Sequence, residues 1–229
     1  MLGLLSYRLP KVLSNRNVCD ILIVGVNPQT GKMFVLIRWD FLASKFQIPA
    51  KGLEDFDADL NSTEAAKFVV SERLLKDLIE KFEYRYVGKI KTSHVGAGSL
   101  GDGPILRNFF VSVFKLEVRR EQNNEVLGFL NEINQQTIRI IEKTEQLGET
   151  VKRALNYYVW AELSQLERKR NLLLGKKLQG FLEIISDLGI ELFKNSLSPV
   201  ILNETNKLPV IETDKIENEA QLDYILKEY

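Results

Sequence analysis

The sequence predicts an α/β fold with a mixed β-sheet, and three observations indicate it. Short apolar runs between turn residues alternate with stretches of helical periodicity along the 229-residue chain, hydrophobic residues make up 45% of it, and it contains only six prolines. A chain of this length and composition can bury a sizeable core. We therefore expect a globular domain whose strands precede, separate and follow its helices.

The first two predicted strands form a hairpin. The apolar run Asp20–Val26 predicts a buried strand, Asn27–Gly31 carries turn residues, and Met33–Ile37 resumes an apolar strand. Gln47–Pro49 is expected to be a short extended segment, because the residue before a proline is biased away from helix. The acid-rich stretch 50–61 then predicts a loop.

A helix and two further strands complete the first half. Apolar residues recur at helical spacing over Ser62–Lys81. Tyr84–Lys91 and Leu106–Val118 have the composition of strands, and a glycine-rich loop, Gly96–Gly103, lies between them. We expect all the strands to share one mixed sheet, with the helix packed on one of its faces.

The second half begins with a polar helical insertion, 121–156. Its apolar residues recur at spacings of three and four, and the sheet with its two helix layers leaves no obvious room to bury this seam. Tyr157–Trp160 predicts one more strand, and Leu172–Phe193 predicts a helix on the opposite face of the sheet. We expect self-association or a partner protein at the seam, through Ile133, Ile140, Leu147 and Val151.

The chain divides into three parts. Residues 1–17 form a basic lead-in, 18–193 form the domain that contains the insertion, and 194–229 form an acidic C-terminal tail. The longest apolar runs are far shorter than the roughly 20 residues that span a bilayer, so no membrane partner is expected. A net charge of zero lacks the global basic field of a protein that coats nucleic acid, and so argues against a nucleic-acid partner.

The numbers of cysteines and histidines bear on the redox compartment of the protein and on the kinds of site it can form. Cys19 is the one cysteine and His94 the one histidine, which excludes an internal disulfide and a multi-histidine metal site. Cys19 adjoins a buried strand and is expected in the core. A reducing, cytoplasmic location fits these counts, and the basic lead-in keeps mitochondrial import open as the alternative.

Five segments, in order, resemble one known family. Phe46–Glu54 is similar to the motif W-x-L-P-G-G-x-x-E, and Thr63–Ala66 follows it into the predicted helix. Arg107–Phe114 resembles the family's late strand, Tyr158–Leu166 its W-x-x-x-E-L strand and turn, and Gly175–Leu182 its last helix. Together they resemble the Nudix hydrolase family, and the resemblance implies an α/β/α sandwich around a mixed sheet.

The resemblance fails at the box that holds magnesium in active Nudix hydrolases. Active members carry G-x5-E-x7-R-E-U-x-E-E-x-G-U, where U is aliphatic, because several carboxylates must face the metal ions. With Ala65 and Ala66 on the small pair of the box, Phe68 stands at the arginine, Val69 at the first glutamate and Arg73 at the last.

One box acid remains, Glu72, with the loop acid Glu54 upstream. A lone carboxylate cannot supply the oxygen cage that Mg²⁺ requires, so the resemblance implies a catalytically degenerate domain with no metal and no cofactor. The acids of the loop at 54–59 could supply replacement oxygens, and Mg²⁺ would then serve a divergent hydrolase. Glu72 can instead pair with Lys76, one helical turn on.

A small set of residues is a candidate for contact with a nucleotide-like ligand. Two are cations that suit phosphate, and two glycines belong to a G-x-G-x-x-G sequence whose backbone amides could meet a phosphate. A strand rather than a helix follows that sequence, so an ordinary inter-strand loop is the alternative. A tryptophan after a strand is expected to pack, or to stack on a base. These candidates are Trp39, Lys51, Arg73, Gly98 and Gly101.

These features favour a catalytically degenerate Nudix-like domain that acts as a ligand-binding or protein-assembly module. The first alternative is a divergent Nudix hydrolase that cleaves a nucleoside-diphosphate derivative with Mg²⁺, and the box carboxylates discriminate the two. The second alternative is a structural subunit of a larger assembly, such as an organellar ribosome. Co-purification of a large complex would identify that role.

Overall fold

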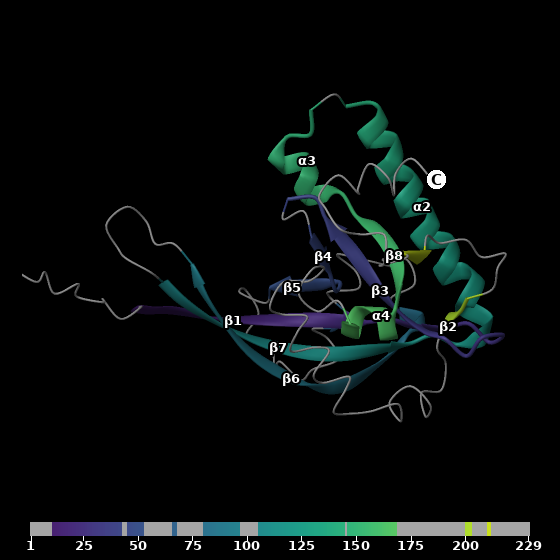
Figure 1. Ribbon diagram of the computed structural model, residues 1–229, viewed down its shortest axis with the longest axis horizontal. Helices are drawn as coiled ribbons and strands as arrows, with labels where there is room; N and C mark the ends of the chain where they lie inside the picture. The colour runs from purple at the N-terminus through teal and green to yellow at the C-terminus, as the bar shows by residue number, and fades with distance from the viewer. Residues whose placement is uncertain are drawn as a thin grey trace, which may run out of the picture.

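The computed structural model describes residues 11–42, 45–52, 66–67, 80–96, 105–144, 146–168, 200–202 and 210–211. Within these ranges the strands form two sheets, which we term sheet A and sheet B, and a long helix lies beside sheet B (Figure 1). The α/β class predicted from the sequence is confirmed, and so is the presence of parallel and antiparallel pairs in one sheet.

Sheet A is a four-stranded mixed sheet in the order β5-β1-β7-β6. Its strands are β1 (Lys11–Leu22), β5 (Ala50–Gly52), β6 (Glu83–Gly96) and β7 (Ile105–Glu117). β1 runs parallel to β7, while β5 and β6 are antiparallel to their neighbours. Because β1 starts at Lys11, the strand takes in residues 11–17, which the sequence assigned to the lead-in.

Sheet B is built around β3 and has the order β10-β8-β3-β2-β9, with β4 paired to β3 as well. Its strands are β2 (Val24–Val26), β3 (Met33–Asp40), β4 (Lys45–Gln47), β8 (Tyr157–Glu162), β9 (Val200–Ile201) and β10 (Val210–Ile211). The hairpin predicted for the first two strands is the β2–β3 pair.

The turn of that hairpin follows from its residues. Asn27 accepts hydrogen bonds at Oδ1 from the backbone N–H groups of Gln29 and Thr30, at 2.9 and 3.1 Å. Gly31 has φ +67°, the left-handed region that favours glycine, and its N–H donates to the Asn27 carbonyl. The turn predicted at Asn27–Gly31 is confirmed.

The expectation of a single sheet is wrong, because the chain changes neighbours at Ile23. β5 pairs with β1 only over Val18–Asp20, and the chain then leaves sheet A at Leu22. Val24 is already paired with β3 in sheet B. At the junction the Ile23 carbonyl accepts a hydrogen bond from Leu36 N–H, at 3.0 Å. One apolar run therefore serves two sheets in succession.

Buried apolar side chains form two clusters, which we term core 1 and core 2. Core 1 joins Val18 and Val113 of sheet A to Ile37 and Val159 of sheet B. Core 2 lies on the alternate residues of the same strands. It contains Cys19, Phe114, Tyr158 and Trp160, together with the buried side of the long helix. The core position expected for Cys19 is confirmed.

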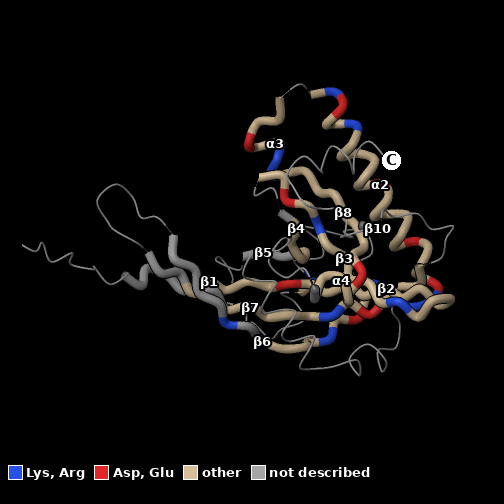
Figure 2. The backbone as a smooth tube through the Cα atoms, in the orientation of Figure 1, with Lys and Arg blue, Asp and Glu red and all other residues tan. Residues whose placement is uncertain are grey.

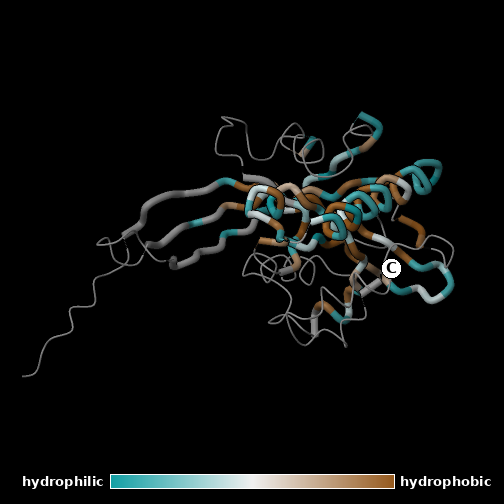
Figure 3. Tube along the Cα trace, turned by 90° about the horizontal axis from the view of Figure 1, so that it is seen from above, coloured by the Kyte–Doolittle hydropathy of each residue, from teal (hydrophilic) through white to brown (hydrophobic). Residues whose placement is uncertain are grey.

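The insertion is helical, as predicted, and four helical segments follow β7 in the described chain. These are the 3₁₀ turn η2 (Arg120–Gln122), α2 (Asn123–Glu142), α3 (Glu149–Ala154) and α4 (Leu163–Arg168). α2 alternates between hydrophobic and hydrophilic residues along its turns (Figure 3). Val126, Leu127 and Leu130 of α2 pack into core 2, so the insertion contributes directly to the core of the protein.

The continuous apolar seam predicted for the insertion is corrected in part. Ile133 packs against core 2 and Leu147 against core 1, whereas Ile140 is 42% exposed and Val151 is 37% exposed. The helix ends at Glu142, and α3 begins only at Glu149, so the spacing of three and four does not continue along one helix.

Two asparagines of α2 bind the backbone of nearby strands as a neighbouring strand would. Asn134 donates from Nδ2 to the Tyr158 carbonyl and accepts at Oδ1 from Tyr158 N–H, both at 2.7 Å. Asn123 makes the same pair of contacts to Ile201, at 3.1 and 2.6 Å. These side chains explain why α2 presents polar residues to the interior.

Most of the helix predicted over Ser62–Lys81 lies outside the described residues. Ala66 and Lys67 are helical, and Lys67 Nζ lies 3.5 Å from Glu80 Oε2. The helix predicted over Leu172–Phe193 lies outside the described residues.

Candidate functional site

Most of the residues that the sequence nominated lie outside the described ranges. This applies to the two acids Glu54 and Glu72, to Arg73, and to Gly98 and Gly101. Their assignment to ligand or metal contact stays a prediction. The positions that the structure does describe are Ala66 of the box, the backbone of Lys51, and Trp39.

Ala66 anchors the box segment to the fold. Its side chain has no exposed surface and lies in core 2 with Cys19 and Phe114 of sheet A. A small residue suits a fully buried position in a close-packed core. Ala66, one residue of the small pair on which the box was aligned, is therefore a packing residue.

Lys51 and Trp39 lie on different sheets. Lys51 is the middle residue of β5 and pairs with Cys19 of β1, which places its backbone at the edge of sheet A. Trp39 is on β3 in sheet B, in core 1 and only 8% exposed. Its ring meets the Phe46 ring edge to face, with centroids 4.7 Å apart.

The burial of Trp39 bears on the two roles considered for it. The packing role is confirmed, because the indole is enclosed in core 1 and engaged by Phe46. A ring buried to this extent leaves little surface on which a base could stack. The assignment of Trp39 to ligand contact stays a prediction.

A group of buried charges that the sequence did not nominate lies on sheet A. Asp20 of β1 is 3% exposed and Lys115 of β7 is 1% exposed. Asp20 pairs with Val113, and Val113 and Lys115 alternate onto the same face of β7, so the two charges share the face that carries core 1. We term Asp20, Lys115 and Glu117 the buried charge group.

Lys115 is held by Glu117 of the same strand. Its Nζ lies 3.3 and 3.4 Å from the two carboxylate oxygens, and the Glu117 side chain is 12% exposed. Burial lowers the pKa of Lys115 most strongly, and nearby Arg85 lowers it further, while the contacts with Glu117 oppose that shift. A buried lysine with a lowered pKa can bind an anion or exchange a proton more readily than a surface lysine.

A sequence signal for this group exists. Lys115 interrupts the run Phe109–Leu116, in which every other residue except Ser112 is apolar. A charged residue at a core-facing position of a buried strand needs a partner, because an unpaired charge there is costly. The pattern marks Lys115 as exceptional but does not identify its partner.

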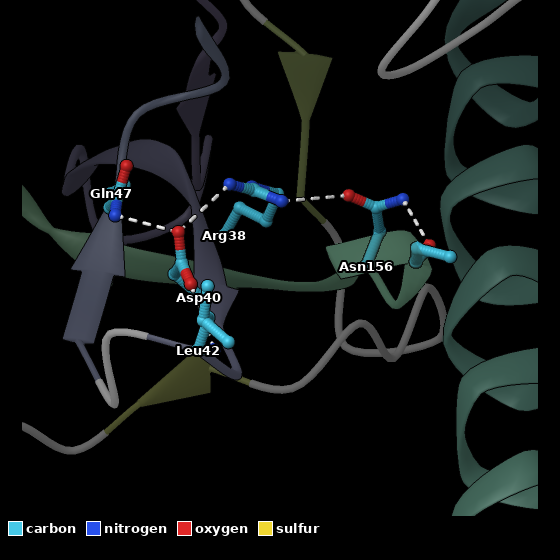
Figure 4. A network of polar contacts seen from close by, with 6 residues as sticks. Arg38, Asp40, Leu42, Gln47 and Asn156 are labelled. Carbon is cyan, nitrogen blue, oxygen red and sulfur yellow. Dashed lines mark hydrogen bonds and ion pairs between the residues drawn. The ribbon is translucent and has the colours of Figure 1, made fainter. Parts of the chain in front are cut away.

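A second polar network closes one end of sheet B (Figure 4). Arg38 of β3 donates to Asn156 Oδ1 at 3.1 Å and to Asp40 Oδ2 at 3.4 Å. Asp40 also accepts from Gln47 Nε2 at 2.8 Å and from Leu42 N–H at 2.9 Å. The network joins β3, β4 and the segment before β8. Its donors and acceptors bind one another, so the network holds these three segments together.

Across the described ranges, no group of three or more His, Cys, Asp or Glu residues is arranged to hold a metal ion. Burial raises the pKa of the Cys19 thiol, and Asp20 raises it further, so the thiol stays protonated. None of the helices in the described part of the chain has the length and apolar character needed to cross a membrane.

Comparison with known proteins gives structural relatives only. No family model matches the chain, and neither does any curated protein. The C. elegans Ap4A hydrolase is 10% identical with a TM-score of 0.40, over 76% of this chain and 98% of that chain. The NUDIX domain of Shewanella oneidensis NrtR, complexed with ADP ribose, is 10% identical with a TM-score of 0.37, over 77% and 89%.

A third similar structure is the Nudix hydrolase RenU from M. smegmatis. It is 13% identical with a TM-score of 0.34, over 79% of this chain and 88% of that chain. NrtR and RenU are named as Nudix proteins, the family that the sequence motifs of this chain resemble.

Proposed function

We propose that this chain is a catalytically degenerate Nudix-like domain that binds a phosphate-bearing, nucleotide-like ligand without hydrolysing it. The observation that carries the proposal is the burial of Ala66 in core 2, beside Cys19 and Phe114. A fully buried small residue is what the small pair of the box requires. It supports the alignment that puts Phe68, Val69 and Arg73 at three box positions.

Charge decides what such a box can do. A diphosphate brings two or more negative charges, and the metal ions that neutralise them need several carboxylates at helical spacing. The alignment leaves Glu72 as the one box acid and adds a cation, Arg73, where hydrolases have an acid. A cation attracts phosphate directly, so the substitution favours binding and disfavours metal-assisted cleavage.

Hydrolysis is tested on the purified full-length chain with Mg²⁺ or Mn²⁺. ADP-ribose, a dinucleoside polyphosphate and a nucleoside triphosphate serve as substrates, and release of a mononucleotide is followed by chromatography. We expect no release above the protein-free background. Metal-dependent release that Glu72→Gln abolishes would overturn the proposal and establish the divergent hydrolase.

Binding is tested by calorimetry with the same three compounds, without metal. We expect at least one to bind, with an affinity that Lys51→Ala and Arg73→Ala each lower about tenfold, since each removes one charge-assisted contact. Lys143→Ala is the control, because Lys143 lies in an exposed position at the end of α2. Absence of binding by all three compounds would leave the ligand part of the proposal without support.

A second role, self-association, is favoured by the two exposed apolar residues of the insertion. Ile140 and Val151 are large side chains with 42% and 37% of their surface exposed. Sedimentation of the wild type and of Ile140→Glu with Val151→Glu compares their masses in solution. A mass above that of one chain, lowered by the double substitution, is the expected result. A wild-type mass of one chain would contradict it.

A further inference from the structure

Three strands of sheet A continue beyond the core and form a segment that we term the arm. It comprises residues 11–17 of β1, 89–96 of β6 and 105–110 of β7, which run out together away from sheet B and the helices (Figure 1). β7 lies in the middle and pairs with both other strands. Lys89 and Ile90 pair with Ser112 and Val111, where the arm meets the buried part of β7. At about 3.3 Å per residue, the arm is roughly 20 Å long.

The arm contains five Lys or Arg residues and no Asp or Glu. The five cations are Lys11, Arg16, Lys89, Lys91 and Arg107. The rest of the chain, with 26 basic and 31 acidic residues, therefore carries −5. On α2 and α3, by contrast, basic and acidic residues are interspersed (Figure 2). The net charge of zero hides this separation, which is why composition alone argued against a nucleic-acid partner.

Side chains at the base of the arm combine an aromatic ring with two cations. Lys89 Nζ and Lys91 Nζ lie 5.7 and 5.8 Å from the centroid of the Phe110 ring. Both lysines are exposed and Phe110 is half-buried. Ammonium groups at this distance are attracted to the ring, which holds them side by side on the strand surface. Asn17, which pairs with Phe110, is half-buried and adds an amide.

We propose that the arm binds single-stranded nucleic acid. Lys89 and Lys91 place two positive charges beside the Phe110 ring on one face of the sheet, where cations can contact a phosphate backbone and an aromatic ring can stack with bases of any sequence. An acidic polypeptide would use the cations but would gain nothing from Phe110. Readout of a double helix uses an element inserted into a groove, and the described part of the arm consists of three paired strands.

Cations on open strands also have a simpler explanation. β6 is an edge strand of sheet A, and β5 covers β1 only over Val18–Asp20, so both sides of the arm are open in the described structure. Lysines on open edges discourage pairing with other chains. That explanation predicts aggregation of charge variants and no nucleic-acid binding, so one experiment separates the two.

Fluorescence anisotropy with labelled U and dT oligonucleotides of about 20 residues measures the interaction of the full-length chain at roughly 50 mM salt. We expect a dissociation constant of about 10 µM or tighter. Lys89→Glu with Lys91→Glu should weaken binding about 30-fold or more. Removal of these two phosphate contacts should also lower the salt slope by about 1.4.

The matched control is Arg139→Glu with Lys143→Glu, which makes the same change in net charge on exposed residues of α2. We expect this control to change the affinity by less than about threefold. Phe110→Leu should weaken binding about tenfold through lost stacking. Circular dichroism checks the fold, and Lys89→Gln with Lys91→Gln replaces the charge reversal if that variant does not fold.

Several results would overturn the proposal. They are an absence of binding by the wild type at low salt, an equal loss in the arm variant and the α2 control, and equal competition by polyglutamate. Equal or tighter binding of a duplex of the same length would contradict the preference for single strands. A comparison of U with dT oligonucleotides then shows whether RNA or DNA is preferred.

Discussion

Sheet A has two parts built from the same three strands, and they differ in what surrounds them. In the first, which we term the body, β1 from Val18 to Leu22 and β7 from Val111 to Leu116 are buried on both faces. In the arm, Asn17, Asn108 and Phe110 are half-buried and Lys91 is exposed. The same strands stay paired from one part to the other, with register shifts at Val12/Ser14 in the arm and at Tyr86/Gly88 in the body.

The comparison shows that the same strands can stay paired while the burial of their side chains changes along their length. The body encloses even charged residues, Asp20 and Lys115, because the strands of sheet B and α4 cover that face. The arm continues the pairing of the same strands, and the residues whose burial is described there are half-buried or exposed. All its charged residues are basic.

The largest expected effect separates two phenylalanines of β7. Phe114 lies in the body, is 1% exposed and meets the Tyr86 ring edge to face at 5.5 Å. Phe114→Ala should lower the free energy of unfolding by about 4 kcal/mol, because it removes a large side chain from a close-packed site. Phe110→Ala, four residues away in the arm, should cost about 1 kcal/mol or less. Urea denaturation measures both, and equal costs would contradict the division of sheet A.

A similar contrast is expected for two lysines. Lys115→Ala should cost about 3 kcal/mol, because it leaves the carboxylate of Glu117 buried without its cation. Lys91→Ala in the arm removes an exposed charge and should cost less than about 0.5 kcal/mol.

The double variant Lys115→Met with Glu117→Gln sharpens that measurement. It removes both charges while keeping side chains of similar size, and it should unfold within about 1 kcal/mol of the wild type. A loss as large as that of Lys115→Ala would show that packing, rather than the unpaired charge, accounts for the cost.

The sequence could predict the strands but not how they are divided between sheets A and B. The run Asp20–Val26 is apolar throughout, so nothing in its periodicity marks the change of sheet at Ile23. The start of β1 was missed for the opposite reason. Residues 11–17 lack the apolar alternation of a half-buried strand, so their sequence does not mark them as part of β1.

The insertion shows why a helix can be predicted while its buried face is not. An apolar pattern predicted the seam through Ile140, which is exposed. The actual interior face includes Asn123, Asn134 and Thr137, polar residues that bond to strand backbones. Lys115 is similar, since its buried position depends on a partner. Polar residues of this kind are recognisable as interior only once the elements they bind are placed.

The backbone of β8 in sheet B, which a side chain of α2 contacts, offers a contrast to the open edges of the arm. Asn134 satisfies the N–H and carbonyl of Tyr158, a residue with no exposed surface. Asn134→Ala should therefore cost about 2 kcal/mol, because it leaves both groups without that partner in the interior. Asn123→Ala, whose partner Ile201 is half-buried, should cost about 1 kcal/mol. Thermal unfolding compares the two, and a larger loss for Asn123→Ala would contradict the role of burial.

The smallest expected effect is on the pH dependence of stability, through Lys115. Burial lowers the pKa of this lysine in the folded protein below its ordinary value of 10.5. Between the folded and the unfolded pKa, the unfolded state binds more protons, so this group makes stability rise with pH in the alkaline range below about 10.5. Below the folded pKa the penalty for burying the charge is present in full.

The double variant Lys115→Met with Glu117→Gln removes this contribution, so its stability relative to the wild type should fall as the pH is raised from about 8 towards 10. Urea denaturation across that range measures the change. Lys91→Met is the control, because Lys91 is an exposed residue of the arm. A double variant that follows the wild type in parallel over this range would show that Lys115 does not lose its charge more readily in the body than in the unfolded chain.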